Sequence, residues 1–166
     1  MPGVPAELGP SRERAARQRD LVAPVVSAEP AVTGGGRPEN DAGTCLRAAR
    51  GALTAAELAE TPAERYLHAQ LAALRVAAVI LAARARVRSR GGPRDVWRVV
   101  SDVAPEFAEW AGYFAATRGK REAVAAGAVA LVSHREADDL VRDAQAFLDV
   151  VARRLDGDAG RSRSAG

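Results

Sequence analysis

The sequence has only two histidines, and one of them heads a short run of residues that could do acid–base chemistry. His134 is followed by Arg135, and Asp138 and Asp139 lie about one helical turn further on. A histidine can transfer a proton near neutral pH and an arginine can hold a phosphate, so these residue types could together perform acid–base chemistry on a phosphate-containing substrate. Adjacent residues on a helix diverge by ~100°, so His134 and Arg135 would converge only across a dimer.

The second histidine belongs to another candidate group. Arg65, His68 and Arg75 have the spacing of residues on one face of a predicted helix. Such a face could bind a small anionic ligand. We favour the alternative that these side chains meet solvent or pair with acidic residues of a neighbouring helix.

A third candidate is a run of arginines around the Gly-Gly-Pro turn at 91–93. Arginine contacts with phosphates contribute much of the affinity of proteins for nucleic acids, so this run could bind RNA or DNA. We favour a solvated helix end, because arginine also stabilises helix C-termini and no aromatic residue lies within 84–94 to stack on a base. The run comprises Arg84, Arg86, Arg88, Arg90 and Arg94.

No motif in the sequence indicates a metal site, a cofactor or a disulfide. The triple glycine at 34–36 follows no predicted strand and precedes no Gly-Lys-Ser/Thr, so it fits a linker rather than a phosphate loop. Cys45 is the only cysteine, which agrees with a reducing cytoplasm. The N-terminus lacks the apolar stretch of a secretory signal. We expect a cytoplasmic protein with no cofactor and no metal.

Composition favours one helical domain. Of the 166 residues 48% are hydrophobic, but only 4% are aromatic, and alanine is abundant. Such a core forms by close approach of helices rather than by packing of large side chains. The net charge of +3 is small and permits nucleic-acid contact without demanding it.

A central helix predicted over Pro62–Arg84 would position the Arg65 group. Thr61 and Glu64 have the spacing of a capping box, with Pro62 at the first helical position. Apolar residues then recur at alternating four- and three-residue spacing and cover most of the helix circumference, which predicts burial among other helices. A membrane span needs about 20 apolar residues. The uninterrupted apolar run covers only 76–83, so we expect no span.

Helices on either side complete the predicted fold. One is expected over 44–60. Another starts at Pro93 or Asp95 and kinks or breaks at Pro105, which removes a helical hydrogen bond. The last helix runs from a second capping box, at Ser133, to Leu155.

The remaining segments carry smaller expectations. The aromatic residues of 107–114 should pack against the central helix rather than form a ligand pocket. Residues 117–127 should form a charged, fraying end, and Asp138 should pair with Arg142 one turn away. The pattern as a whole predicts an all-α fold, a four- to five-helix antiparallel bundle with disordered termini. Its expected parts are an N-terminal arm at 1–42, a bundle at 43–155 and a C-terminal tail at 156–166.

Several stretches resemble an actinobacterial group of HEPN-domain proteins. They are PAERY and LAALR in the central helix, VAPEFAEWAGYFAA around Pro105, and READDL at the start of the last helix. The resemblance spans about 43–155 and implies a HEPN-like bundle of four to five helices.

The same resemblance sets expectations for chemistry and partners. Active members of the wider superfamily are metal-independent endoribonucleases, often toxins paired with nucleotidyltransferase antitoxins, and they act as dimers. Their signature is an arginine followed four to six residues later by a histidine, at the start of a late helix. This chain departs from it, because neither 61–63 nor 127–129, the corresponding positions before His68 and His134, contains an arginine.

We therefore hypothesise a catalytically inactive HEPN-like domain that acts by binding a partner protein, RNA or nucleotide. The resemblance implies a homodimer, with a nucleotidyltransferase as a further possible partner. Two alternatives stay open. One is a toxin-type endoribonuclease with a non-standard site, and the other is a bundle that binds a small anion. Their residues are His134, Arg135, Asp138 and Asp139 for the first, and Arg65, His68 and Arg75 for the second.

Overall fold

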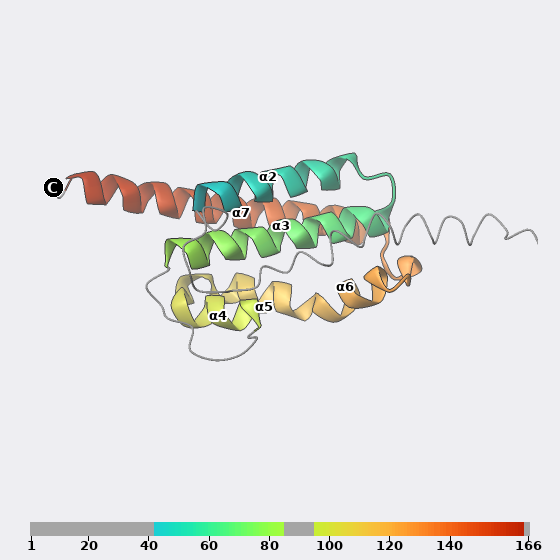
Figure 1. The fold of residues 1–166 in the computed structure, drawn as a ribbon. Coiled ribbons are helices and arrows are strands. Elements are labelled where there is room, and N and C mark those ends of the chain that lie inside the picture. Colours follow the sequence, from blue (N-terminus) through green and yellow to red (C-terminus); the bar gives the residue numbers. More distant parts are fainter. Residues whose placement is uncertain (1–41, 85–94, 165–166) are drawn as a thin grey trace, which may run out of the picture.

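The chain folds into a bundle of helices (Figure 1). The computed structural model describes residues 42–84 and 95–164, and no strand occurs in these two ranges. The all-α bundle predicted from the sequence is confirmed, while the predicted arm lies outside the described residues except for Ala42. The elements in order are α2 (Ala42–Leu58), α3 (Pro62–Ala83), α4 (Val96–Val103), η2 (Pro105–Phe107), α5 (Ala108–Ala116), α6 (Arg118–Ala125), η3 (Val129–Leu131) and α7 (His134–Ser164).

α3 is the central helix, and it packs against α2, α4, α6 and α7. It starts with the predicted capping box. The Thr61 hydroxyl accepts a hydrogen bond from the Glu64 amide at 3.2 Å, and the Glu64 carboxylate accepts one from the Thr61 amide at 3.3 Å. Within the described ranges, α3 alone is long and apolar enough to cross a membrane, but 67% of that window is buried inside the bundle. Such burial is what a core helix requires.

α2 and α3 form a hairpin (Figure 1), and small side chains of α2 are buried in the bundle. α2 buries Ala49, Ala52 and Ala56, none of them more than 3% exposed. Alanine lets helix backbones approach closely, as the composition predicts. Arg75 of α3 reaches across the hairpin, where its Nη1 donates a hydrogen bond to the Ala48 carbonyl at 2.8 Å.

Aromatic side chains fill the space between α4, α5 and α7. The prediction that the aromatic residues of 107–114 pack against the central helix is only partly right: Phe107 and Phe114 are buried, but the ring contacts are with Trp97 of α4 and Phe147 of α7, and Tyr113 is 42% exposed. The ring centroids of Trp97 and Phe114 lie 5.3 Å apart, those of Trp110 and Phe147 also 5.3 Å, and those of Phe114 and Phe147 5.5 Å. The predicted break at Pro105 is confirmed, because α4 ends at Val103 and the short helix η2 begins two residues later, at Pro105. This break lets α5 turn its aromatic residues toward α7.

Two segments are more helical than we predicted. Residues 118–125 form α6 rather than a fraying end, and Gly127, with a φ of 108°, closes it. We placed the end of the last helix at Leu155, followed by a tail, whereas α7 continues to Ser164 and projects beyond the neighbouring helices (Figure 1). No proline interrupts 156–164, an Arg161–Asp158 ion pair lies within the extension, and its two glycines disfavour a helix without ending it.

Candidate binding pocket

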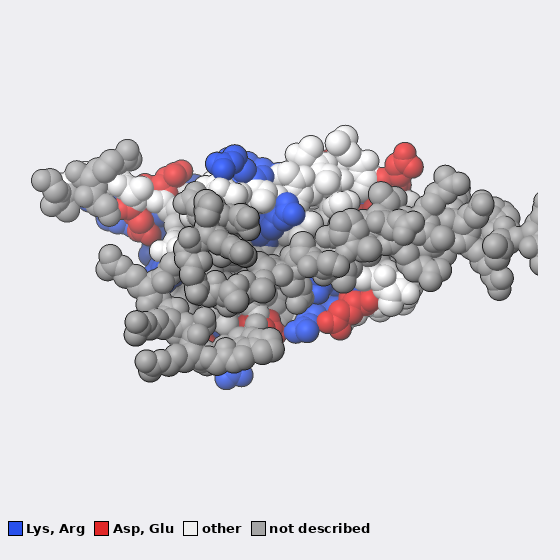
Figure 2. All heavy atoms as spheres, in the orientation of Figure 1, with Lys and Arg blue, Asp and Glu red and all other residues white. Residues whose placement is uncertain are grey.

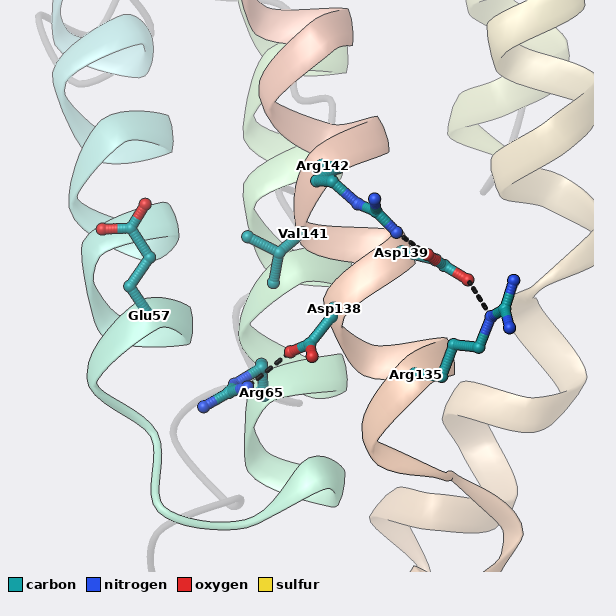
Figure 3. A pocket seen from close by; sticks show the side chains of 7 residues that line it. All are labelled: Glu57, Arg65, Arg135, Asp138, Asp139, Val141 and Arg142. Carbon is teal, nitrogen blue, oxygen red and sulfur yellow. Dashed lines mark hydrogen bonds and ion pairs between the residues drawn. The ribbon is translucent and has the colours of Figure 1, made fainter.

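An open pocket lies where the end of α2 and the start of α3 meet the first turns of α7 (Figure 3). Its volume is about 620 Å³, within the range of sites for small ligands or side chains of a partner. Seven residues from these three helices line it: Glu57, Arg65, Arg135, Asp138, Asp139, Val141 and Arg142.

Two capping boxes fix the helices that form the pocket. The box at Thr61 starts α3 four residues before Arg65. At α7, the Ser133 hydroxyl accepts from the Glu136 amide at 3.2 Å, and Glu136 accepts from the Ser133 amide at 3.0 Å. Lys120 of α6 also donates to Glu136 at 2.5 Å. The hydrogen bond from Lys120, together with those from the Ser133 amide and hydroxyl, lowers the pKa of the Glu136 carboxyl to about 2, so it is ionised throughout the physiological range.

Arg65 connects all three helices at the pocket. Its Nη1 pairs with Asp138 of α7, and its Nη2 donates to the Ala59 carbonyl, just beyond α2, at 3.3 Å. The Nε atom is buried without a hydrogen-bond partner. The pairing agrees with the sequence-based alternative that this group meets acidic residues of a neighbouring helix. Its guanidinium is therefore already occupied by protein groups on two sides.

Asp139 holds the two remaining arginines of the pocket. Arg142, one turn further along α7, pairs with one of its oxygens, and the Arg135 Nε lies 3.8 Å from the other (Figure 3). The predicted Asp138–Arg142 pair is therefore wrong. Asp138 pairs with Arg65 of α3, a residue that the sequence pattern of α7 alone does not indicate. Arg142 pairs with Asp139 instead.

The pocket carries both charges in equal number, but they are not evenly distributed. Its lining has three arginines and three carboxylates. On one side, which we call the Glu57 side, Glu57 and Asp138 outnumber Arg65. On the other, the Asp139 side, two arginines surround one aspartate (Figure 3). Within the described residues Glu57 makes no hydrogen bond or ion pair. The pocket therefore has an excess of negative charge beside α2 and an excess of positive charge at Arg135 and Arg142 of α7.

The two histidines lie apart from this pocket. His134 is the exposed first residue of α7 and does not line it, although Arg135, Asp138 and Asp139 do. His68 is half-buried, with an Nδ1 atom that has no hydrogen-bond partner. Burial lowers the pKa of its imidazole, the charge of Arg75 lowers it further, and that of Glu64 opposes both. The structure therefore divides both groups that we selected from the sequence, since only Arg65 of the second group lines the pocket.

The arginine run falls mostly outside the described residues. Arg84 is described, and its Nη2 lies 2.5 Å from the Glu106 carboxylate, which ties the end of α3 to η2. The other four members, Arg86, Arg88, Arg90 and Arg94, lie outside. In the part of the chain that the structure describes, no group of three or more His, Cys, Asp or Glu side chains is arranged to hold a metal ion.

Three lining residues were missed as site residues from the sequence: Glu57, Val141 and Arg142. Val141 and Arg142 belong to the amphipathic pattern of the last helix and gave no separate signal. Glu57 did carry one. It is an acidic residue in the last turn of a helix, where the dipole disfavours a negative charge. The short connection to the next helix then implied that it lies near the start of α3.

The chain matches one known family. A profile of the SAV_6107-like HEPN family matches residues 56–152, which is more than half of the chain and includes every residue that lines the pocket. The chain therefore belongs to this HEPN family. No curated protein and no solved structure matches it.

Proposed function

We propose that this HEPN-family chain acts without catalysis, by binding a partner protein at the pocket between α2, α3 and α7. The observation that carries the proposal is the separation of the histidines from the pocket. Acid–base cleavage of RNA needs a proton-transfer group beside a phosphate-binding cation. Here the cations of the pocket are paired with aspartates, and neither histidine lines it.

The balance of charge favours a protein partner over RNA or a nucleotide. A polyanion is bound by an excess of basic side chains. In this pocket a phosphate would meet Glu57, Asp138 and Asp139 as well as the three arginines. On the face drawn in Figure 2, the visible basic and acidic side chains adjoin one another along the lower edge, while over α2 they lie at opposite ends. Mixed charges of this kind suit the polar rim of a protein interface.

Charge reversal at the pocket tests the proposal. Quantitative co-purification from cells of the source organism would compare the tagged wild type with a Glu57→Arg, Asp139→Arg double variant. The control is Glu60→Arg, Asp149→Arg, which reverses two exposed acids that do not line the pocket. A specific partner should lose about tenfold or more in recovery with the pocket variant, corresponding to ~1.4 kcal/mol of binding, and none with the control. Equal recovery in both would refute the proposal.

One observation favours a second candidate, a ribonuclease with a non-standard site. Arg135, Asp138 and Asp139 line one pocket, and His134 is their immediate neighbour on α7. A homodimer, which the HEPN resemblance implies, would be needed to bring His134 of one copy toward Arg135 of the other. Incubation of single-stranded RNA with pure protein decides between the two candidates. Cleavage that His134→Ala abolishes would establish the ribonuclease, and an intact substrate agrees with a binding domain.

A further inference from the structure

We infer that the exposed face of α2 pairs with the same face of a second copy of the chain, with the two α2 helices antiparallel across a two-fold axis. This pairing goes beyond the proposed function, because it concerns the outside of α2 and a second copy rather than the pocket and its partner. Three properties of α2 point to it: the order of its charges, a glycine at its centre and an exposed leucine at its end.

One side of α2 faces away from the other helices. A line of four residues at spacings of four, three and four, which we call the outer seam, runs along this side: Arg47, Gly51, Thr54 and Leu58. All four are exposed, and the buried residues of α2 lie on the opposite side of the helix. Arg50 and Glu57, which are also exposed, lie seven residues apart and therefore on the same flank of the outer seam.

The charges of α2 are arranged against its helix dipole. The first turn has no acidic residue and the last turn has no basic one, whereas Glu57 lies in the last turn, where a carboxylate is disfavoured. Over α2 the visible basic side chains lie at one end and the acidic ones at the other (Figure 2). Within the described residues, the side chains of Arg50 and Glu57 make no hydrogen bond or ion pair with each other or with any other group. An opposite charge from a second molecule would compensate each of them.

The direction of the second helix follows from these charges. In an antiparallel pair, Arg50 of each copy lies beside Glu57 of the other, and such flanking ion pairs set the orientation of paired helices. In a parallel pair, Arg50 would meet Arg50 and Glu57 would meet Glu57, which is destabilising. A two-fold interface places the same surface on both copies, so that surface must complement itself. The face of α2 does so in the antiparallel direction alone.

The residues of the outer seam fit the same arrangement. With the two-fold axis midway between Gly51 and Thr54, these two residues lie opposite each other. Gly51 disfavours the helix relative to alanine, and a Cβ atom there would meet no atom within 4 Å, so packing within the described residues does not require a glycine. Between two helices, a residue without a side chain lets the backbones approach closely.

The ends of the outer seam complete the pairing. Leu58 is 77% exposed, the largest value among the large apolar side chains of the described residues. In the antiparallel register it lies opposite Arg47 of the second copy. An arginine can lay its methylene groups along an apolar side chain while its guanidinium stays in water. The pair would therefore cover Leu58 at both ends of the interface.

The size of this face predicts a weak pair. A stable interface comprises about 20–30 residues on each side. The outer seam and its two flanking charges amount to far fewer. We therefore expect the two copies to exchange with monomers, and we expect added salt to weaken the pair, because salt screens exposed charges.

Exchange of charge between positions 50 and 57 tests the inference, with sedimentation equilibrium of the full chain at low salt as the readout. The wild type should self-associate. Arg50→Glu and Glu57→Arg should each weaken self-association about tenfold or more, because each variant places like charges at both flanking contacts. Arg98→Glu is the matched control, at an exposed arginine of α4 on the other side of α3 (Figure 1), and it should have no effect. Circular dichroism verifies that the variants keep their helicity.

An equimolar mixture of the two variants is the most specific test. When an Arg50→Glu chain meets a Glu57→Arg chain, both flanking contacts again join opposite charges. The mixture should therefore associate more tightly than either variant alone, close to the level of the wild type. A monomeric wild type, variants that associate as well as the wild type, or a mixture no tighter than its components would each overturn the inference.

The pairing and the proposed function can fail separately. Arg50 does not line the pocket, so Arg50→Glu changes the pairing surface without changing the pocket lining. A monomeric wild type that still recovers a partner through the pocket would refute the pairing and keep the proposed function. A chain that passes the mixing test but recovers no partner would do the opposite.

Discussion

The two faces of α7 differ in burial and in charge. One face, with Phe147 at its centre, closes the aromatic cluster of α4 and α5, and its residues are almost fully buried. The other face presents Asp138, Asp139 and Arg142 to an open pocket beside α2 and α3. Both faces belong to the same few turns of one helix, but apolar burial stabilises one of them and exposed ion pairs lie on the other.

The two faces differ in how much they contribute to the free energy of folding. Buried aromatic side chains each contribute several kcal/mol through burial and packing. Exposed ion pairs contribute between zero and about 1 kcal/mol, because solvent screens them. The side chain of Asp138 is 53% exposed and that of Arg135 is 91% exposed, so neither pair is explained by stability alone. The charged face is the part of α7 at which we propose that a partner contacts the bundle.

The largest expected effect is on the aromatic face. Phe147→Ala should lower the free energy of unfolding by about 3–5 kcal/mol, because it removes a fully buried ring that contacts Trp110 and Phe114. Urea denaturation followed by circular dichroism measures this loss. A loss below ~1 kcal/mol would show that the cluster tolerates a cavity and would remove the contrast between the faces.

A smaller effect is expected at the helix start that supports the charged face. Thr61→Ala removes the acceptor for the Glu64 amide and should cost about 1 kcal/mol of unfolding free energy. The same denaturation experiment applies, with Thr54→Ala as the control, since the hydroxyl of Thr54 only donates to the Arg50 carbonyl within α2. Equal losses in both variants would mean that the capping box does not hold the start of α3.

The pH dependence of stability should report His68. Its pKa is lowered in the folded chain, so as the pH falls below the ordinary value of 6.5 the unfolded chain binds the proton first. Stability should therefore be full above pH 6.5 and decline below it, until the folded imidazole is also protonated. His68→Gln should flatten this part of the profile in thermal unfolding followed from pH 7.5 to 5. An unchanged slope would place the titration elsewhere.

The smallest effect is expected from the charged face itself. Arg135→Ala should change the free energy of unfolding by less than ~0.5 kcal/mol, because the pair with Asp139 is long and exposed. Differential scanning calorimetry at low and high salt measures it. A loss comparable with that of Thr61→Ala would assign the pocket charges to stability and weaken the case for recognition.

The parts of the fold that depend on neighbours in sequence could be predicted from the sequence. Both capping boxes, at Thr61 and Ser133, and the break at Pro105 were found because each involves residues within one helical turn. The length of α7 was underestimated, because two glycines lower helix propensity by only ~1 kcal/mol each and do not end a helix by themselves.

The candidate site could be predicted only in part. Arg65, Asp138 and Asp139 were selected from the sequence, but in two separate groups, because the pairing of Arg65 with Asp138 joins residues that are far apart in the chain. Glu57, in the last turn of α2, also lines the pocket, because the short connection between α2 and α3 places it near the start of α3. Tertiary packing decides such pairings, and the periodicity of a single helix does not contain them.

Site-specific photo-crosslinking tests the central claim, that the pocket face of α7 contacts a partner protein, most directly. A photoreactive amino acid would replace Arg142, in the pocket lining, or Arg153, an exposed arginine on the same helix outside the lining. After irradiation in cells of the source organism, we predict a discrete crosslinked protein at position 142 and none at 153. The same crosslinks at both positions, or at 153 alone, would contradict the claim.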